Sequence, residues 1–307
     1  MEDLISVIMS VYNETNSELL LSINSILNQT YKNIEFIIVD DNPDNKRIKE
    51  FLSLQNDSRI RIIYNKKNMG LVSSLNEALK HVNGKFVARM DADDVSLKNR
   101  IEKEYKYLLK NNLDLVGTWI RLIDTRNKYI GEIQFPTTIE GIKKQMKFGG
   151  CIAHPTWFGK TKVFESLKGY RHMLYCEDYD FLLRALDKRF KLGNISFYGL
   201  NYRIRENGIS LSNKNMQLII RRFLSRNIIN INSITDENLR EFIDSKKFSK
   251  ELSRLNSYEM AKNKLYNFNL VSVVQLITNK NFYIYLHEKF VCYIYRKLYI
   301  EGDNNVF

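Results

Sequence analysis

The sequence predicts an α/β protein with a doubly wound, mostly parallel sheet and a helical extension at its C-terminal end. Three observations support this prediction. Short apolar runs rich in β-branched residues alternate with helical patterns through the first hundred residues. Each apolar run stops at polar or acidic residues, which is typical of strands that end at one edge of a sheet. From about residue 216 onward, the sequence shows only helical patterns.

Four strands are expected in the first hundred residues. They cover residues 5–11, 35–39, 60–64 and 86–88. Helical spacing of apolar residues places a helix after each of the first three strands, in the segments around Leu19, Ile48 and Leu75. Ser17 is the expected N-cap of the first helix. Strands and helices that alternate at these lengths indicate a parallel sheet.

The pattern after residue 95 is less regular. A helix around Ile101 and Leu108 is followed by two strands between residues 115 and 135, with a turn at 126–127, and by a helix over 140–148. We divide the chain into a domain of residues 1–212, with halves 1–95 and 96–212, and a helical extension of residues 213–307.

The last expected helix lies within residues 281–299 and is aromatic, basic and amphipathic. Such a helix can lie in a membrane interface, pack on the protein core or form a homodimer contact, and the sequence leaves these three alternatives open. No stretch reaches about 18 uncharged apolar residues, so a transmembrane helix is not expected.

Composition narrows the class of protein. The net charge is +12, from 47 basic and 35 acidic residues, and suits nucleic acid, anionic lipid or a phosphorylated substrate. The basic residues are spread along the chain without a zinc-finger or RNP signature, so no nucleic-acid partner is expected. The three cysteines show no CxxC spacing, which fits the cytoplasm or the inner face of the cytoplasmic membrane.

The most informative stretch is the acidic turn after the fourth strand. Asp91, Asp93 and Asp94 stand together there, the first two as a DxD motif. Like charges repel and their burial is costly, so a divalent cation would resolve the conflict. Carboxylate oxygens suit Mg²⁺ or Mn²⁺, which would in turn hold a substrate diphosphate. The alternative is a solvated acidic turn without a ligand.

The other strands end in polar residues at the same edge. These residues are Tyr12, Asn13 and Glu14 after the first strand, Asp40 and Asp41 after the second, Asn68 after the third, and Arg89 at the acidic turn. Their convergence predicts a nucleotide site. The absence of GxGxxG and GxxxxGK[ST] motifs argues against a dinucleotide oxidoreductase and a P-loop enzyme.

These motifs resemble those of family 2 inverting glycosyltransferases of bacterial surface-polysaccharide pathways. The matching segments are 6–14, 39–41, 68–70 and 88–94, together with 154–156, 169–171 and 177–178, and the resemblance runs from about residue 4 to residue 210. It implies a GT-A fold, a nucleotide-sugar donor such as a UDP-sugar, and a glycan or lipid-linked acceptor of capsule, lipopolysaccharide or another surface glycan. Residues 1–95 would bind the donor and residues 96–212 the acceptor.

The resemblance also implies roles for individual residues. Asp40 would face the uracil base, and Tyr12 and Glu14 would line the nucleoside pocket. Arg89 would approach the nucleotide or its phosphates, Asp91 the ribose or the metal, and Asp93 would ligate the metal. The substrate-binding set also includes Asn13, Asp41, Asn68 and Arg205.

A second acidic pair, Glu177–Asp178, stands at the start of a helical pattern, where the helix dipole favours an ionised carboxylate. Inverting transfer needs one base to take the proton of the acceptor hydroxyl in a single in-line displacement. Asp178 is the expected base and Glu177 its support, and the alternative is a helix cap without catalytic function. His154 either positions the acceptor or has a structural role.

One residue departs from the family pattern. Relatives often have a histidine after the last sheet strand, where this chain has Arg205. Arginine cannot ligate a metal but can pair with phosphate, so metal dependence is left open. Two rival functions remain: a sugar nucleotidyltransferase, whose glycine-rich basic loop is missing after the first strand, and a catalytically inactive scaffold that binds a nucleotide-sugar.

Overall fold

The computed structural model describes residues 2–205, 212–265 and 278–300, so parts of the predicted domain and extension (206–211, 266–277 and 301–307) lie outside it. The described residues form a nine-stranded sheet in the order β3-β2-β1-β4-β8-β6-β9-β5, with β7 beside β6. The strands are β1 (Ile5–Val11), β2 (Ile34–Asp40), β3 (Ile60–Tyr64), β4 (Phe86–Arg89), β5 (Val95–Ser96), β6 (Leu115–Ile123), β7 (Tyr129–Ile133), β8 (Phe158–Lys160) and β9 (Leu192–Arg203).

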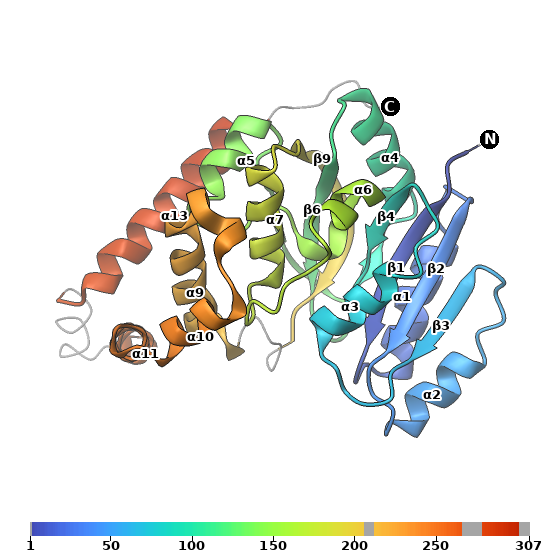
Figure 1. Ribbon diagram of the computed structural model, residues 1–307, viewed down its shortest axis with the longest axis horizontal. Helices are drawn as coiled ribbons and strands as arrows, with labels where there is room; N and C mark the ends of the chain where they lie inside the picture. Colours follow the sequence, from blue (N-terminus) through green and yellow to red (C-terminus); the bar gives the residue numbers. More distant parts are fainter. Residues whose placement is uncertain (1, 206–211, 266–277, 301–307) are drawn as a thin grey trace.

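Helices cover the sheet and continue beyond it (Figure 1). The α-helices are α1 (Asn16–Leu27), α2 (Lys46–Ser53), α3 (Leu71–Leu79), α4 (Arg100–Lys110), α5 (Ile139–Gln145), α6 (Thr161–Ser166), α7 (Glu177–Asp187), α9 (Lys214–Arg226), α10 (Asp236–Asp244), α11 (Lys246–Leu265) and α13 (Lys280–Leu298). Two 3₁₀ turns, η1 (His154–Thr156) and η2 (Ile228–Ser233), complete the described elements.

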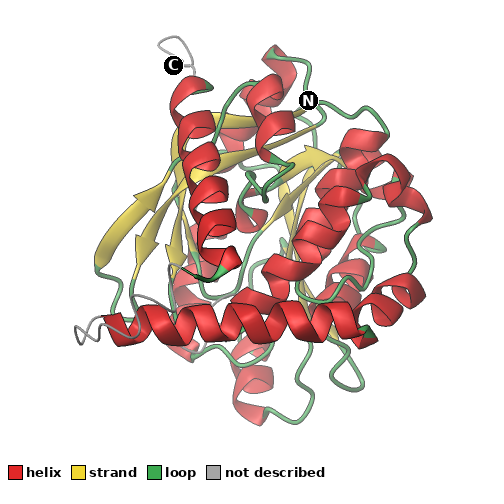
Figure 2. Ribbon diagram, turned by 90° about the vertical axis from the view of Figure 1, so that its left-hand side faces the viewer, coloured by secondary structure: helices red, strands yellow, loops and turns green. Residues whose placement is uncertain are grey.

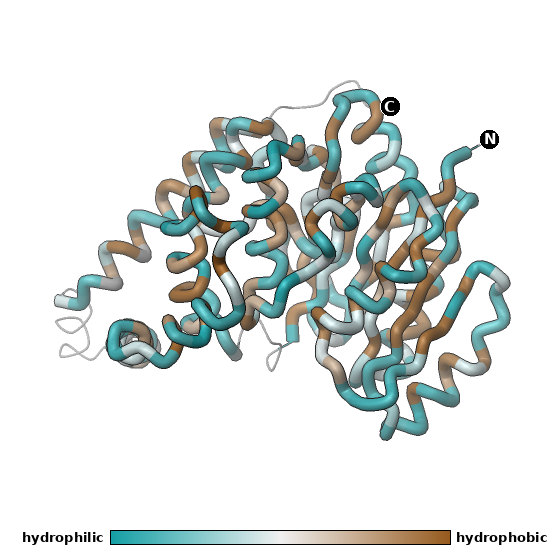
Figure 3. Tube along the Cα trace, viewed as in Figure 1, coloured by the Kyte–Doolittle hydropathy of each residue, from teal (hydrophilic) through white to brown (hydrophobic). Residues whose placement is uncertain are grey.

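The predicted doubly wound, mostly parallel sheet is confirmed. Strands β3, β2, β1 and β4 pair in parallel, and Figure 1 shows α3 in front of them and α1 behind. Hydrophobic residues gather along these strands in Figure 3, because strands covered on both faces bury both sets of side chains. The parallel register aligns the carboxyl ends, so Val11 lies opposite Asp40 and Ile8 opposite Arg89. This alignment places the polar loop residues at one edge.

The second half of the sheet is mixed, and the sequence did not show its short strands. Strand β8 runs antiparallel between β4 and β6, whereas β9 pairs in parallel with β6. Strand β5 is only two residues long and pairs with β9. Strands this short carry too few residues for a period-two pattern, so only tertiary pairing reveals them.

The predicted N-cap of α1 was wrong. Thr15, not Ser17, caps the helix, because its hydroxyl accepts a hydrogen bond from the N–H of Glu18. The Glu18 carboxylate accepts the N–H of Thr15 in return, at 2.8 Å. This reciprocal arrangement is the capping box, which the Thr-x-x-Glu spacing in the sequence encodes.

The C-terminal helices pack on the sheet domain through charged anchors. Arg171 binds the buried carboxylate of Asp180 in α7 and donates to the carbonyls of Ile231 and Ile234. Arg222 in α9 pairs with Glu251 in α11 and with Glu288 in α13. Figure 2 shows α11 lengthwise, below the other helices of this extension. Arg171 therefore ties the extension to the sheet domain through hydrogen bonds, whereas the ion pairs of Arg222 join the helices of the extension to one another.

Helix α13 has one packed face and one exposed apolar face. Its packed end is tied to the sheet domain, since the carbonyl of Tyr299 accepts the N–H of Thr137 at 2.9 Å. The opposite face exposes Tyr283, Leu286, Phe290, Tyr293 and Leu298. Core packing, one of the three alternatives for this helix, is therefore confirmed for one face. None of the described helices combines the length and hydropathy needed to cross a membrane.

Two buried ionisable side chains, Arg100 and Glu104, lie beneath the edge that carries the acidic turn. The guanidinium of Arg100 donates to the carbonyls of Pro155 and Arg89, at 2.6 and 3.3 Å, and so ties η1 to the end of β4. Glu104 lies one turn along α4, with 3.8 Å between its carboxylate and Nε of Arg100. Burial raises the pKa of Glu104 from its ordinary 4.5 to about 8. The carboxyl group is therefore protonated at neutral pH.

We expect Glu104→Gln to flatten the pH dependence of stability. As pH rises from 4.5 toward 8, an unfolded chain loses the Glu104 proton while the folded chain keeps it, so folding stability falls. A glutamine cannot lose this proton. Urea unfolding of the wild type should show a lower free energy of unfolding at pH 8 than at pH 5, and the variant should show a smaller decrease.

Glu102→Gln on the same helix is the matched control. Its carboxylate is partly exposed and pairs with Lys106, which lowers its pKa. This group is ionised in both the folded and unfolded states between pH 5 and pH 8, so the control should keep the wild-type decrease. An unchanged slope in Glu104→Gln would show that Glu104 is ionised in the folded protein.

Candidate active site

The loop after β1 folds around Glu14. The Glu14 carboxylate accepts the backbone N–H groups of Tyr12 and Asn13, at 2.8 and 3.1 Å. Burial raises the pKa of Glu14, while these hydrogen bonds and the nearby charge of Arg205 oppose the rise. The Tyr12 side chain is 48% exposed and Asn13 is exposed. The loop therefore presents an aromatic ring to solvent and keeps its carboxylate close to the acidic turn.

The two aspartates after β2 have different environments. Asp41 is buried and accepts the N–H groups of Met69 and Gly70 and the amide of Asn65, so it holds the loop before α3 in place. Gly70 adopts φ = +81°, which directs its N–H toward this carboxylate. Asp40 is also buried, but one of its oxygens, Oδ2, has no hydrogen-bond partner. Asp40 is therefore the member of the pair with a free acceptor.

Asn68 lies on the same loop. It is exposed, and its side-chain oxygen accepts the N–H of Gly70 at 3.0 Å. Its predicted contact with the donor stays a prediction, as does that of Asp41, whose carboxylate already accepts three hydrogen bonds.

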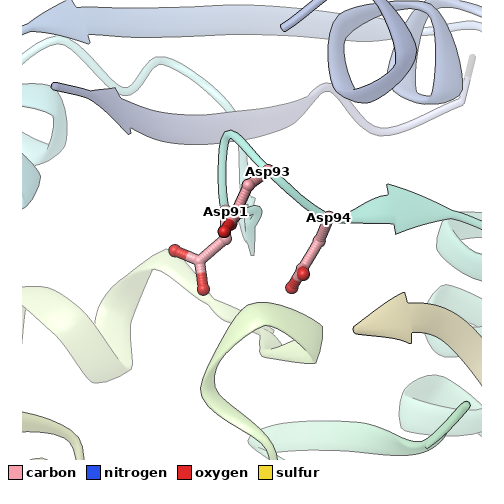
Figure 4. A group of neighbouring side chains, drawn as sticks. All are labelled: Asp91, Asp93 and Asp94. Carbon is pink, nitrogen blue, oxygen red and sulfur yellow. The ribbon is translucent and has the colours of Figure 1, made fainter. Parts of the chain in front are cut away.

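The acidic turn gathers three carboxylates. Figure 4 shows Asp91, Asp93 and Asp94 projecting from one turn, and one oxygen from each lies within 4.8 Å of the others. The guanidinium of Arg89 binds Asp91 through both terminal nitrogens, one of them at 2.6 Å. Burial, followed by the charge of Asp91, raises the pKa of Asp93 to about 6 and that of Asp94 well above its usual range. Burial and mutual repulsion therefore disfavour the ionised forms of Asp93 and Asp94.

Two arginines at the end of β9 reach this turn. Arg203 is buried; its backbone N–H donates to the Asp94 carboxylate and its Nε to the carbonyl of Asp93, both at 2.8 Å. Nε of Arg205 lies 2.9 Å from a carboxylate oxygen of Asp93, and its Nη2 lies 3.1 Å from Glu18. Arg205 therefore pairs with the expected metal ligand instead of standing apart from it.

The charges at this edge do not balance. Four guanidinium groups, those of Arg89, Arg100, Arg203 and Arg205, lie near five carboxylates, those of Glu14, Glu18, Asp91, Asp93 and Asp94. The difference is one negative charge when all five are ionised. Oδ2 of Asp94 is buried without a hydrogen-bond partner. A divalent cation fits both the charge excess and the oxygen donors of this set.

His154 lies in η1 and is buried. Its Nε2 lies 2.9 Å from the hydroxyl of Tyr170, and its ring packs against Trp157 at a centroid distance of 4.5 Å. Burial lowers the pKa of His154 well below its usual value, and the charge of Arg89 lowers it further, so the ring is neutral. These contacts support the structural alternative for His154, and contact with the acceptor stays a prediction.

The second acidic pair lies at the predicted helix start, since α7 begins at Glu177. Burial and the charge of Asp178 raise the pKa of Glu177 to about 7. Burial also raises the pKa of Asp178, although the N–H of Tyr179 and the guanidinium groups of Arg221 and Arg89 oppose the rise. The Glu177 carboxyl group can therefore exchange a proton near neutral pH, and the pKa of Asp178 is raised in the same direction.

Arg89 connects the two acidic groups. Its charge lowers the pKa of both Glu177 and Asp178, while it forms the paired contact with Asp91. The charge of Asp91 in turn raises the pKa of Glu177. The acidic turn and the α7 pair therefore both lie within electrostatic range of the same guanidinium group.

Sequence reasoning missed three residues near this region. Glu18 could have been found from the capping-box spacing after Thr15. Arg203 stands two residues before Arg205 in the same motif, but only the pairing of β9 reveals its contacts with the acidic turn. Arg221 lies on α9, beyond the recognised motifs, and no sequence signal marks it.

Comparisons with known proteins agree with this geometry. The family model described as glycosyl transferase family 2 matches residues 6–168, which include the strand-end residues from Tyr12 to Asp94. The O-antigen biosynthesis glycosyltransferase WbnJ of Escherichia coli is 40% identical over 208 residues, covering 66% of this chain and 80% of WbnJ. An uncharacterized glycosyltransferase of Methanocaldococcus jannaschii is 38% identical over 213 residues, covering 67% of this chain and 73% of the relative.

A further relative carries a more specific name. The UDP-Glc:alpha-D-GlcNAc-diphosphoundecaprenol beta-1,3-glucosyltransferase WfgD of Escherichia coli is 33% identical over 220 residues, covering 70% of this chain and 82% of WfgD. Glu177, Asp178 and Arg205 lie beyond the residues that the family model matches.

We expect Arg205→Gln to raise the pKa of Asp93 above about 6, because the guanidinium at 2.9 Å lowers it in the wild type. Carbon NMR of the aspartate carboxyl groups across a pH titration would measure the shift in metal-free buffer. Arg61→Gln, at an exposed position of β3, removes the same charge and should leave the Asp93 titration unchanged. An Asp93 pKa equal in both variants would contradict the ion pair.

Proposed function

The chain belongs to glycosyl transferase family 2, and from that membership we propose that it moves a sugar from a UDP-sugar to a hydroxyl of a glycan or lipid-linked acceptor in bacterial surface-polysaccharide synthesis. One observation carries the proposal: Arg89 acts electrostatically on both the acidic turn and the α7 acid pair. The names of two relatives support the substrate class, since WbnJ is an O-antigen enzyme and WfgD is named for a UDP-sugar and a lipid diphosphate.

Donor recognition begins at the ends of β1 and β2. The buried, unpartnered Oδ2 of Asp40 accepts the uracil N–H, because a buried acceptor without a donor is otherwise costly. The exposed ring of Tyr12 packs on the nucleoside. Asp41 keeps the loop before α3 in register through its hydrogen bonds to Met69 and Gly70.

The charge excess at the acidic turn supports a divalent cation, Mg²⁺ or Mn²⁺, held by Asp93 and Asp91. A bound cation supplies positive charge to the departing diphosphate. Arg205 lies beside Asp93 and pairs with the same diphosphate, since its guanidinium is not restricted to one carboxylate. The histidine expected at this position would ligate the metal, whereas Arg205 contributes charge directly.

Asp178 is the proposed base. It takes the proton of the acceptor hydroxyl as that oxygen attacks the sugar, on the side opposite the diphosphate, in one displacement that inverts the anomeric centre. Arg221 and Arg89 favour its ionised form, because both oppose the rise in pKa that burial causes. Glu177, with a pKa of about 7, lies under the influence of Asp91 and supports the base from the donor side.

We expect Asp178→Asn to abolish sugar transfer and to retain UDP binding. The amide keeps the shape of the carboxyl group but cannot accept a proton, and a lost general base costs about 10²–10⁴-fold in rate. Release of UDP from a panel of UDP-sugars, with Mg²⁺ or Mn²⁺ and glycan acceptors, measures transfer, and calorimetry measures UDP binding. EDTA should suppress both the transfer and the metal-dependent part of binding.

Asp244→Asn, at an exposed position at the end of α10, is the control for loss of one carboxylate. Normal turnover in Asp178→Asn would reject the base assignment, and loss of turnover in Glu177→Gln alone would transfer the role to Glu177. The products separate the rival functions. Free UDP with a glycoside supports transfer, pyrophosphate exchange supports a nucleotidyltransferase, and binding without turnover supports a scaffold.

The exposed face of α13 supports a peripheral membrane contact. Tyr283, Phe290 and Tyr293 are each more than half exposed, and Lys289 and Lys297 lie exposed beside them. Aromatic side chains flanked by lysines suit the boundary between headgroups and acyl chains. A membrane contact would bring a lipid-linked acceptor to the enzyme, whereas a second copy of the chain is the competing occupant of this face.

We expect Phe290→Ser/Tyr293→Ser to reduce sedimentation with phosphatidylglycerol vesicles several-fold, because interfacial binding scales with buried apolar area. Leu54→Ser/Ile229→Ser removes two apolar side chains that are 74% and 87% exposed elsewhere, and should sediment as the wild type does. Equal sedimentation of the two variants would exclude the membrane contact. A wild-type dimer that the first variant converts to a monomer would assign the face to homodimerisation.

A further inference from the structure

A cavity of about 270 Å³ lies between the C-terminal end of α5 and helices α9, α11 and α13. Four basic side chains line it, Lys147, Arg221, Arg222 and Arg226, together with Glu251 and Glu288. None of the residues assigned to the donor or to the acid pair lines this cavity. It is therefore a separate feature of the C-terminal extension.

The charges of the cavity are unevenly paired. Both glutamates bind Arg222, with Glu251 at 3.1 Å and Glu288 at 2.9 Å. Within the described ranges, no carboxylate forms an ion pair with Lys147, Arg221 or Arg226. Nε of Arg221 is buried and has no hydrogen-bond partner. The four basic side chains of the lining outnumber its two carboxylates, an excess of two positive charges that favours an anionic ligand.

Arg221 extends from the cavity toward the proposed base. A Cβ atom at Gly149 would lie 3.1 Å from Nη1 of Arg221, so the glycine gives the guanidinium room beside the loop after α5. The charge of Arg221 reaches Asp178, Cys176 and Tyr179 at the start of α7. Arg221 therefore lines the cavity and also lies within electrostatic range of Asp178.

We propose that this cavity binds a phosphate or diphosphate group carried by the acceptor. The inference rests on the proposed function, because it names the class of acceptor that the transferase uses. Guanidinium and ammonium groups bind phosphate oxygens through charge-assisted hydrogen bonds. Pockets for whole ligands usually measure about 300–1,000 Å³, so this smaller cavity suits a headgroup whose attached sugar extends outside it.

A phosphate bound beside Arg221 would position the acceptor for sugar transfer. An acceptor anchored by its phosphate on the cavity side of Arg221 can extend its sugar past α7, toward Asp178. The anchoring group does not react and loses no bond. Its binding energy orients the attacking hydroxyl, which converts an encounter between two substrates into a reaction within one complex.

The cavity also differs from the donor edge in its need for metal. The donor edge has excess carboxylates, so a diphosphate there needs a cation. The cavity has excess basic groups, so it should bind a diphosphate in the presence of EDTA. This difference allows the two sites to be separated in one experiment.

The test measures the binding of inorganic pyrophosphate to the full chain by calorimetry, in buffer that contains EDTA. We expect Lys147→Gln/Arg226→Gln to weaken pyrophosphate binding at least about tenfold, because each substitution removes a charge-assisted contact. Both residues are exposed, so the fold should tolerate the change. Arg240→Gln/Lys250→Gln removes the same charge from exposed positions of α10 and α11 outside the cavity, and should bind as the wild type does.

Three results would overturn the proposal. The first is a wild type that binds no pyrophosphate in EDTA, and the second is equal binding in both double variants. The third is binding that excess UDP displaces completely, which would place pyrophosphate at the donor edge. If the cavity variant keeps pyrophosphate binding and loses only sedimentation with phosphatidylglycerol vesicles, the cavity recognises a membrane surface and the acceptor assignment is wrong.

A kinetic comparison separates this inference from the proposed function. With a short-chain glycosyl diphosphate as acceptor, the cavity variant should raise KM about tenfold relative to its KM for the uncharged glycoside of the same sugar. An unchanged KM ratio would overturn the acceptor assignment. If the wild type turns over no UDP-sugar at all, the proposed function fails, and the pyrophosphate result still decides whether the cavity binds an anion.

Discussion

Excess carboxylate at the edge of a parallel sheet is the constraint on which the rest of this structure depends. Asp91, Asp93 and Asp94 occupy one turn, and each contacts an arginine residue. Asp91 binds the guanidinium of Arg89 at the end of β4, Asp93 pairs with that of Arg205, and Asp94 accepts the backbone N–H of Arg203. Without these partners, the desolvated charges would favour an open turn. The architecture of the second half therefore serves to bring β9 beside the turn, even though 109 residues separate Arg203 from Asp94.

The parallel half of the sheet was predictable because its physics is local. Runs such as Ile5–Val11 show their strand character without any partner, and parallel strands that alternate with helices must share one carboxyl edge. The sequence could not distinguish Asp40 from Asp41, because adjacent residues at a strand end point in different directions. The structure separates them, since Asp41 is saturated with hydrogen bonds and Asp40 keeps one oxygen free.

The remaining site residues depend on contacts that no local pattern records. The parallel pairing of β9 with β6 brings Arg203 and Arg205 to the acidic turn. The packing of α9 against the start of α7 brings Arg221 within electrostatic range of Asp178. The cap of α1 is the opposite case: the Thr15–Glu18 spacing was in the sequence, but the neighbouring Ser17 also offered a hydroxyl, and only the reciprocal hydrogen bond decides between them. The sequence shows which residue types are present, but it does not show which distant segments pair, and the missed contacts depend on that pairing.

The electrostatics on the two sides of the α7 acid pair are opposite in sign, and this difference sorts the substrates. Toward the acidic turn, carboxylates outnumber guanidinium groups, so under the proposed function a diphosphate would bind there together with a cation. Toward α9, Arg221 belongs to a group of basic side chains that outnumber the carboxylates around the cavity, so a bound anion would need no cation there. A donor diphosphate and an acceptor phosphate would therefore favour different ends of the site. The Glu177–Asp178 pair lies between these ends, where a sugar held from one side can meet a hydroxyl held from the other.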